Sequence, residues 1–339
     1  MIRIDGSTGE GGGQILRTAL SLSLCTGQAF RIERIRARRR RPGLQPQHLA
    51  AVQAAAAIGQ ARVQGAEAGS GTLEFAPGPV RPGNYRFDIG TAGSTTLVLQ
   101  TVLPPLMLAA APSRVAIEGG THNPMAPPFE FLQHAWRPLI ERMGPRLALQ
   151  LERPGFYPAG GGLITAAIEP VARLAPLQLD ERGPVHALQA EILLCHLPRH
   201  IAERERSILQ RAFDIPETQI RIRIDDTAPG PGNAVSLFVA SEHVTEVFTA
   251  IGRRGLPAEK VAGQVVTAAR EYLSADVPVG RHLADQLLLP LALAGEGRFA
   301  TLPPSRHTTT NITIIRQFLD IDIRCEAIDS RRWQVHMQR

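Results

Sequence analysis

The chain has few lysines, cysteines and aromatic residues, and these shortages narrow its chemistry. Lys260 is the single lysine among 37 basic side chains, and its context, EKVAG, is not the KxDG-like motif of a lysine-type adenylyl transferase. Only 5% of the residues are aromatic. Cys25, Cys195 and Cys325 are too widely spaced for a disulfide framework or a zinc site. We therefore expect a protein of the reduced cytoplasm.

Long apolar segments are also missing. The longest, Leu97–Ala111, is too short to span a bilayer and contains proline and glutamine, so we expect no membrane association. The first residues, MIRIDGSTGEGGG, lack the apolar core of a secretory signal. Hydrophobic residues make up 44% and charged residues 20% of the chain, as in an ordinary globular protein. A chain of 339 residues can form one large domain or two domains.

The net charge of +6 is carried almost entirely by arginine, whose planar fork of donors fits phosphate oxygens. A codon preference for arginine is the alternative explanation of this bias. The densest positive charge is Arg38–Arg41, preceded by Arg34 and Arg36. On an exposed strand and loop this run would attract a polyanion, with an affinity that falls as salt rises. A solvated basic face remains the alternative.

One order of elements recurs along the chain: strand, glycine-rich turn, apolar helix, strand, polar loop, helix, then one or two strands. The copies cover residues 2–75, 85–169 and 282–338. A candidate opening strand for the third copy, Leu177–Glu181, lies far before its helix. The residues between have their own strand and helix pattern. The sequence therefore predicts an α/β (α+β) fold, with a large domain of residues 1–181 and 277–339 and a small inserted α/β domain of residues 182–276.

Each copy has an unusually polar loop before its second helix. These loops are Arg36–Gly43, Glu118–Pro124 and Pro303–Asn311. Equivalent loops of a pseudosymmetric domain can point toward one edge, which would assemble a site from residues far apart in sequence. Symmetry could equally bring together three solvated loops.

Two short segments carry residues suited to phosphate chemistry. GEGGGQ (Gly9–Gln14) precedes an apolar helix, and helix starts attract phosphate. Its Glu10 could hold a divalent metal, although a tight turn with a surface glutamate is the alternative. The segment is neither a Walker A loop nor a Rossmann fingerprint. His307, in the polar loop SRHTTTN, could act as a nucleophile near neutral pH or be an ordinary surface histidine. Gln47 and His48 could add hydrogen bonds to a phosphate or sugar.

Seven ordered segments together resemble the RNA 3'-terminal phosphate cyclase family over nearly the whole chain. They are DGSTGEGGGQILR, RPGLQPQHLAAV, GTAGSTTLVLQTVLP, GGTHNPMAPP, GFYPAGGG, HLADQLLLPLALAG and SRHTTTNI. The resemblance implies a large domain of three βαβαββ-type units, like the C-terminal domain of translation initiation factor 3, and a thioredoxin-like insert. It also implies that ATP forms a covalent histidine-AMP. The AMP then passes to an RNA 3'-phosphate, and the adjacent 2'-OH closes a 2',3'-cyclic phosphate and expels AMP.

The resemblance also assigns residues. His307 matches the adenylylated histidine, and Glu10 matches a glutamate near the triphosphate and its Mg²⁺ or Mn²⁺. The positions that match ATP contacts are Gln100, Pro127, Phe131, His282, Leu283, Ala284, Asp285 and Gln286. The positions that match the family's phosphate-binding residues, for RNA or other phosphates, are Arg17, Arg36, Arg39 and Gln47. His282 departs from the tyrosine expected there, which puts its contact with adenine in doubt.

Other interpretations stay open. The family includes a cyclase-like branch that acts in ribosome assembly without catalysis, although His307 and Glu10 are both present here. Enolpyruvyl transferases contain a related fold but need two such domains, for which this chain is too short. A purely RNA-binding module would leave the ATP-side segments unexplained. The sequence is compatible with a homodimer but does not establish one.

Overall fold

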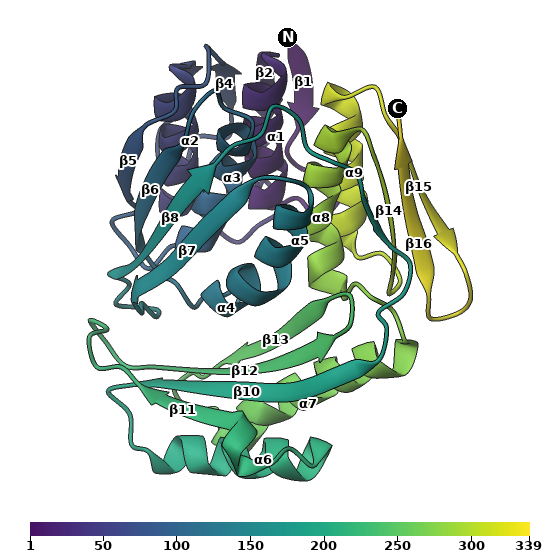
Figure 1. The fold of residues 1–339 in the computed structure, drawn as a ribbon. Helices are drawn as coiled ribbons and strands as arrows, with labels where there is room; N and C mark the ends of the chain where they lie inside the picture. Colours follow the sequence, from purple (N-terminus) through teal and green to yellow (C-terminus); the bar gives the residue numbers. More distant parts are fainter.

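The computed structural model describes residues 1–339 as a mixed α/β fold with four four-stranded sheets (Figure 1). In the first sheet the strand order is β1-β2-β4-β3, with β1 and β2 parallel and the other pairs antiparallel. Its strands are β1 (Ile2–Asp5), β2 (Phe30–Glu33), β3 (Arg62–Gln64) and β4 (Leu73–Ala76), and its helices are α1 (Gly13–Thr26) and α2 (Pro46–Gly59).

The second sheet has the order β5-β6-β8-β7 and the same succession of one parallel and two antiparallel pairs. Its strands are β5 (Asn84–Asp88), β6 (Ser113–Gly119), β7 (Arg146–Arg153) and β8 (Gly162–Glu169). Helix α3 (Thr95–Met107) follows β5. The second helical segment of this copy is divided into α4 (Phe129–Phe131), the π-helical turn η1 (Leu132–Trp136) and α5 (Arg137–Arg142).

The third sheet repeats this succession in the order β15-β16-β14-β9. Its strands are β9 (Leu177–Leu179), β14 (Glu296–Thr301), β15 (Asp322–Ala327) and β16 (Trp333–Gln338), and its helices are α8 (Arg281–Ala294) and α9 (Arg306–Phe318). Strand β9 precedes the whole fourth sheet in the chain, whereas its parallel partner β14 follows it.

The fourth sheet has the order β11-β10-β12-β13 and lies below the others in Figure 1. Its strands are β10 (Val185–Cys195), β11 (Ile220–Ile224), β12 (Gly232–Ser241) and β13 (Thr245–Ile251). Its helices are α6 (His200–Phe213), the 3₁₀ turn η2 (Glu217–Gln219) and α7 (Ala258–Ala275). The sequence pattern did not lead us to expect β13, because its buried face includes a glutamate, Glu246, which disturbs the apolar alternation.

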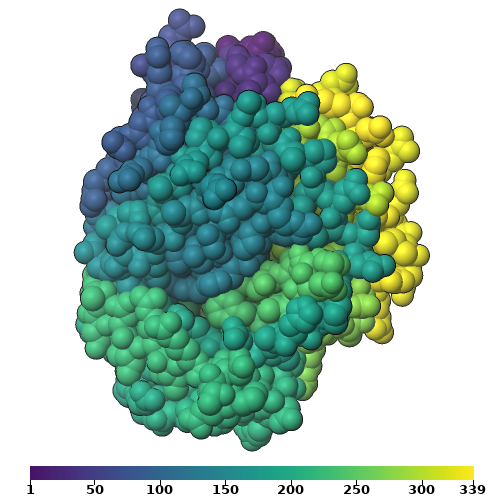
Figure 2. Space-filling view, viewed as in Figure 1, coloured from purple at the N-terminus to yellow at the C-terminus, as the bar shows by residue number.

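Two large hydrophobic cores hold these layers together, beside a third cluster of five buried residues around Phe156 and Cys195. The larger is shared by the first three sheets and their helices, and the smaller lies between the fourth sheet and helices α6 and α7. Val244 and Val247, from the edge of the fourth sheet, belong to the larger core. The part of the chain around the fourth sheet therefore packs directly against the rest, as the space-filling view shows (Figure 2). No helix combines the length and the hydropathy of a membrane span.

Candidate active site

The candidate active site lies where helices α1, α8 and α9 begin. Helix α9 packs against both α1 and α8, which brings residues from the two ends of the chain together. We expected His307 in a loop, but it is the second residue of α9. The helix starts there because the Ser305 hydroxyl accepts a hydrogen bond from the Thr308 N–H at 3.1 Å. The exposed His307 side chain thus lies at a helix N-terminus, which attracts phosphate.

A glutamine connects this histidine to a buried carboxylate. Gln14 Nε2 donates to Asp285 Oδ1 at 2.5 Å, so the amide oxygen of Gln14 points the other way. That oxygen lies 2.8 Å from His307 Nδ1. An amide oxygen can only accept, so in the neutral imidazole His307 Nδ1 carries the proton and Nε2 has the lone pair. The contacts fix the tautomer that a nucleophilic histidine needs.

Asp285 is held as an acceptor by three amide groups. Besides Gln14, Asn311 Nδ2 lies 3.4 Å from Oδ1 and Gln286 Nε2 donates to Oδ2 at 3.0 Å. Burial raises the pKa of Asp285, and the Gln14 hydrogen bond, His307 and Arg17 oppose this shift. The network continues outward, because Gln100 Nε2 donates to Gln286 Oε1 at 2.7 Å. Sequence reasoning thus named both ends of this chain of contacts.

Glu10 lies at the edge of the same site. Its carboxylate is 5% exposed, accepts the Gly12 N–H at 2.8 Å and pairs with the half-exposed Arg39. Its backbone N–H donates to Thr310 Oγ1 at 3.0 Å. Gly9 permits this approach, because its φ is +56° and an added Cβ would lie 2.0 Å from the Thr310 hydroxyl. The first and third polar loops therefore meet here.

Positive charge surrounds the start of α1. Desolvation lowers the pKa of Arg17 to about 10, against the opposing charges of Glu10 and Asp285, so this guanidinium stays positive near neutral pH. Desolvation, followed by Arg17 and Arg36, lowers the pKa of His48 to about 3. The neutral His48 accepts the Gln45 N–H at Nδ1 over 3.1 Å. His48 is therefore a neutral polar neighbour of the arginines.

Close packing around Gly13 brings the same groups together. A Cβ at Gly13 would lie 2.3 Å from His48 Nε2 and 2.8 Å from Arg17 Nη1. Arg36 is fixed by its own loop, since its Nη1 donates to the carbonyls of Arg41 and Gly43 at 2.5 and 3.1 Å. Desolvation, helped by Arg39, lowers the pKa of Arg36. The arginine loop is thus folded beside the glycine-rich turn.

The remaining expected residues differ in how accessible they are. His282 is exposed at the start of α8, and desolvation by neighbouring atoms, Arg281 and His307 lower its pKa. Leu283, Ala284 and Phe131 are buried in the larger core, so their side chains are not available to a ligand in this structure. Gln47 Oε1 accepts the Ser94 N–H at 3.2 Å.

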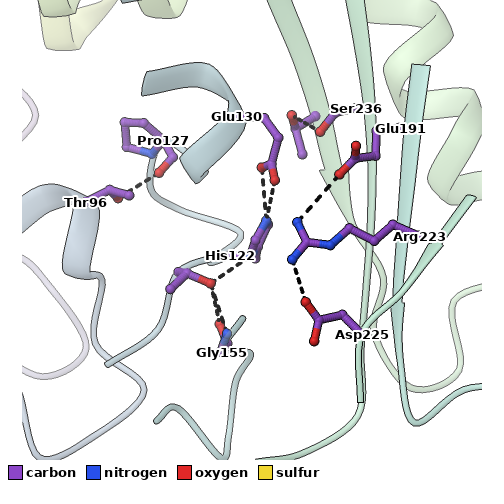
Figure 3. Close-up of polar contacts among 11 residues, drawn as sticks. Thr96, His122, Pro127, Glu130, Gly155, Glu191, Arg223, Asp225 and Ser236 are labelled. Atoms are coloured by element: carbon purple, nitrogen blue, oxygen red, sulfur yellow. Dashed lines mark hydrogen bonds and ion pairs between the residues drawn. The ribbon is translucent and has the colours of Figure 1, made fainter. Parts of the chain in front are cut away.

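The second polar loop does not join this cluster through His122. The His122 side chain is fully buried where the body of the protein meets the fourth sheet, and Nε2 lies 2.9 Å from Glu130 Oε2 (Figure 3). Opposite this pair, Arg223 donates to Asp225 at 2.5 Å and lies 4.0 Å from Glu191. We call these five residues the seam cluster. The expectation of one site fed by three loops therefore holds for two of them.

Pro127 follows that second loop, beyond the seam cluster. Its carbonyl accepts the Thr96 hydroxyl at 2.7 Å (Figure 3). This bond ties the segment before α4 to the start of α3, the helix that carries Gln100. Pro127 is therefore hydrogen-bonded to the helix that contains Gln100.

The side chains of the candidate site could bind a divalent metal only together with a phosphate ligand. No three His, Cys, Asp or Glu side chains lie close enough to hold an ion. Glu10 offers one hard carboxylate, and Mg²⁺ is often held by one carboxylate together with substrate phosphates. A metal here would thus take most of its ligands from a bound triphosphate.

Sequence reasoning missed three polar residues of the site. Gln14 orients His307, Asn311 supports Asp285, and Thr310 holds Glu10. Gln14 ends the GEGGGQ segment, and Thr310 and Asn311 end SRHTTTN, so the segments were recognised without these roles. The usable signal is a polar residue at a position that the helical pattern buries: Gln14, Thr310 and Asn311 are all less than a tenth exposed.

Comparisons with known proteins agree on one family. The model of the RNA 3'-terminal phosphate cyclase family matches residues 8–325. The RNA 3'-terminal phosphate cyclase of Koribacter versatilis (strain Ellin345) is 57% identical over 95% of this chain and 90% of its own. That of Ralstonia nicotianae (strain ATCC BAA-1114 / GMI1000) is 55% identical over 96% and 94%.

Among solved structures, the enolpyruvyl transferase NikO from Streptomyces tendae aligns with a TM-score of 0.38 at 12% identity. The alignment covers the whole of this chain but 48% of that one, a likeness too low to carry an argument. The sequence relatives, by contrast, are matched over nearly their full length. The chain belongs to the RNA 3'-terminal phosphate cyclase family.

Proposed function

We propose that this enzyme uses ATP to convert an RNA 3'-terminal phosphate into a 2',3'-cyclic phosphate through an AMP adduct on His307. The observation that carries the proposal is the contact between Gln14 and His307, which leaves the accessible Nε2 of the imidazole with its lone pair. The relatives named RNA 3'-terminal phosphate cyclase support the overall reaction. The single lysine, Lys260, offers no comparable nucleophile.

In the first step His307 Nε2 attacks the α-phosphorus of ATP, forming a P–N bond and expelling pyrophosphate. The proton on Nδ1 stays on the ring and donates to Gln14, whose amide is held by Asp285. The imidazole gains positive charge as it attacks, and the Asp285 carboxylate, one amide away, stabilises that charge. Arg17 and the N-terminus of α9 lie where the triphosphate charge would need balancing.

In the second step an oxygen of the RNA 3'-phosphate attacks the phosphorus of the histidine adduct and the P–N bond breaks. In the third step the adjacent 2'-OH attacks the activated 3'-phosphorus, loses its proton and expels AMP. Ring closure is favoured because the attacking hydroxyl is already in place. Arg36, Arg39 and Gln47 are the candidate side chains for the RNA phosphate, which explains why an arginine-rich loop lies beside Glu10.

For ATP we assign the α8 segment from His282 to Gln286, together with Gln100, Pro127 and Phe131. The exposed His282 could stack on the adenine, whereas the buried Leu283, Ala284 and Phe131 would shape the pocket wall from behind. A bound Mg²⁺ or Mn²⁺ would be held by Glu10 and would polarise the phosphates. In that state Arg39 would exchange its contact with Glu10 for one with a phosphate.

We also infer the architecture behind the site. The first three sheets share one pairing order, which supports three copies of a βαβαββ-type unit, as in the C-terminal domain of translation initiation factor 3. Residues 182–276, with their own core, would be a thioredoxin-like α/β domain inserted between β9 and α8. The low cysteine content supports a cytoplasmic enzyme.

The test uses RNA of one sequence ending in a 3'-phosphate or a 3'-hydroxyl. With ATP and Mg²⁺ or Mn²⁺, we expect only the first RNA to become resistant to phosphatase, with release of AMP and pyrophosphate. Folded protein that binds both RNAs and changes neither would favour the alternative, a non-catalytic RNA-binding protein of ribosome assembly.

A further inference from the structure

Glu246 is a buried carboxyl group of the fourth sheet that contacts the body of the protein. It lies on β13, is 2% exposed, and its Oε2 accepts the Gly280 N–H at 2.7 Å. Its other oxygen accepts only the neighbouring Val247 N–H, at 3.3 Å. A buried carboxyl group with no cationic partner is costly, so its one long-range contact is informative.

Gly280 is the residue at which helix α8 begins. It is the N-cap residue of α8, and no side chain within the helix start caps the first turn. A glycine cannot supply a capping side chain, and the first turn contains no acidic residue. The carboxyl group of Glu246 satisfies the N–H of the N-cap residue itself, as the glutamate of a capping box does, but it comes from a distant part of the chain, and it lies at the positive end of the helix dipole.

Glu246 and Gly280 are closely packed. An added Cβ on Gly280 would lie 2.7 Å from Glu246 Oε2, so the glycine lets the carboxyl group approach the backbone. The segment before α8 is held from several sides. Arg182 pairs with Asp276 at 2.8 Å, and the Tyr272 hydroxyl donates to the Pro278 carbonyl at 3.1 Å. Residues 182–276 thus help to fix the start of α8, together with the Val279 N–H, which donates to the Ala300 carbonyl at 3.3 Å.

Helix α8 is also the element that carries Asp285 and the exposed His282. Asp285 lies on the second turn, five residues after Gly280, and orients Gln14. A small rotation or fraying of the first turn would move both residues relative to His307. Distances between a nucleophile and its partners need to be held within about 0.5 Å in a working site.

We propose that Glu246 is a positioning residue, which fixes the start of α8 through Gly280 and so aligns His282 and Asp285 with His307. The inference rests on the proposed function for the consequence in ATP use. It gives the fourth sheet's part of the chain a defined role, namely to hold the nucleotide-binding helix. Burial raises the pKa of Glu246 to about 7, and the hydrogen bonds from the Gly280 and Val247 N–H groups oppose this shift.

The test compares Glu246→Ala with Glu246→Gln, which keeps an oxygen for the Gly280 N–H. Self-adenylylation is measured at varied ATP, and hydrogen exchange is measured over residues 281–290 without nucleotide. We expect Glu246→Ala to raise the half-saturating ATP concentration about fivefold, the value of one hydrogen bond, because His282 moves, and to lower the maximal rate by a similar factor, because Asp285 no longer holds Gln14 and His307 in place. Exchange over 281–290 should accelerate. Glu246→Gln should stay within about twofold in both assays.

Glu205→Ala is the matched control. Glu205 is fully buried on α6, and burial also raises its pKa to about 7. Its Oε2 accepts a hydrogen bond from Asn233 Nδ2 at 3.0 Å, within residues 182–276. Glu205→Ala should lower the stability of residues 182–276 without changing how self-adenylylation depends on the ATP concentration. Equal effects of Glu205→Ala and Glu246→Ala, or unchanged exchange over 281–290 in Glu246→Ala, would overturn the proposal. If the wild-type protein takes no AMP, the proposed function fails, and the exchange measurement alone decides the role of Glu246.

Discussion

Two histidines of this protein are held by very different surroundings. His307 is exposed at a helix start, and one ring nitrogen is bound by the neutral amide of Gln14. His122 is fully buried in the seam cluster, its Nδ1 lies 2.7 Å from the Thr121 hydroxyl, and its Nε2 is bound by the Glu130 carboxylate (Figure 3). Its ring also stacks on Phe156, with centroids 5.0 Å apart.

The difference separates a reactive histidine from a structural one. Thr121, His122 and Glu130 have the hydroxyl, imidazole and carboxylate of a hydrolase triad, yet both ring nitrogens are occupied and no substrate can reach them. Burial acts to raise the pKa of Glu130, but the charge and hydrogen bonds of His122 outweigh it and the net pKa lies below its ordinary value. Accessibility and a free lone pair, more than residue type, distinguish the two sites.

Replacing His307 should remove activity, whereas replacing His122 should lower stability. His307→Ala removes the nucleophile and should lower cyclisation by at least about 10³-fold, with an unchanged melting temperature. His122→Ala leaves Glu130 buried without its partner and should lower the melting temperature by several degrees, while the protein that stays folded remains active. Cyclisation rates and thermal unfolding of both variants make the comparison. The distinction between the two histidines breaks down if His122→Ala, while folded, loses as much activity as His307→Ala.

Gln14→Glu sharpens the comparison by giving His307 a carboxylate partner like that of His122. The new charge would repel Asp285 and attract a positive charge on the His307 ring, which reduces the neutral nucleophile. We expect the adenylylation rate at pH 7 to fall by about 10- to 100-fold, with part of the loss recovered as pH rises. Gln28→Glu is the control, because Gln28 donates to the Phe318 carbonyl away from the site. A loss that does not vary with pH would argue against a change in the protonation of His307.

Arg39→Ala should separate the two substrates. Removing a guanidinium beside Glu10 should lower the use of RNA 3'-phosphate by about tenfold and self-adenylylation by less. Arg38→Ala, at an exposed neighbouring position, should change either step by less than about threefold. Rates of labelling and of AMP transfer to RNA give the two values. Equal losses in both steps would indicate a structural role for Arg39.

The smallest effect is on stability and pH. The folded-state pKa values of Glu205 and Glu246, about 7, lie above the ordinary glutamate value. The folded protein therefore binds protons that the unfolded chain releases, and the stability contributed is lost as pH rises from about 4.5 to 7 and beyond. Each Glu→Gln change should flatten this decline, by at most about 1.4 kcal/mol per pH unit. Urea unfolding at pH 5.5 and 7.5 measures it, and an unchanged slope in both variants would show that neither carboxyl group titrates in this range.

Much of the secondary structure follows from local pattern. The amphipathic segment of residues 200–213 gives α6 with the bounds that its periodicity predicts. Strand β13 was missed because Glu246 occupies a buried position on it, and the sequence offers no sign that a partner waits at Gly280. Interactions that break a local pattern are the ones that bring distant elements together.

The candidate site likewise combines residues that the sequence indicates with an arrangement that it does not. Glu10, His307 and Asp285 lie in segments whose chemistry or family resemblance singled them out. Their arrangement could not be read from spacing, since the Gln14–Asp285 hydrogen bond joins residues 271 positions apart. Likewise, nothing local distinguishes the second polar loop, whose histidine packs in the seam, from the two loops that meet at Glu10. The packing of α9 between α1 and α8 determines which polar loops lie at the site.

The central claim is that His307 carries AMP, and its most direct test is to locate the label. The wild-type protein is incubated with ATP labelled at the α-phosphate and Mg²⁺ or Mn²⁺, denatured, treated with acid and mapped by peptide. The account predicts an acid-labile adduct, as expected for a P–N bond, on the peptide that contains His307. An acid-stable label, a label on a peptide without His307, or no label on folded protein would contradict it.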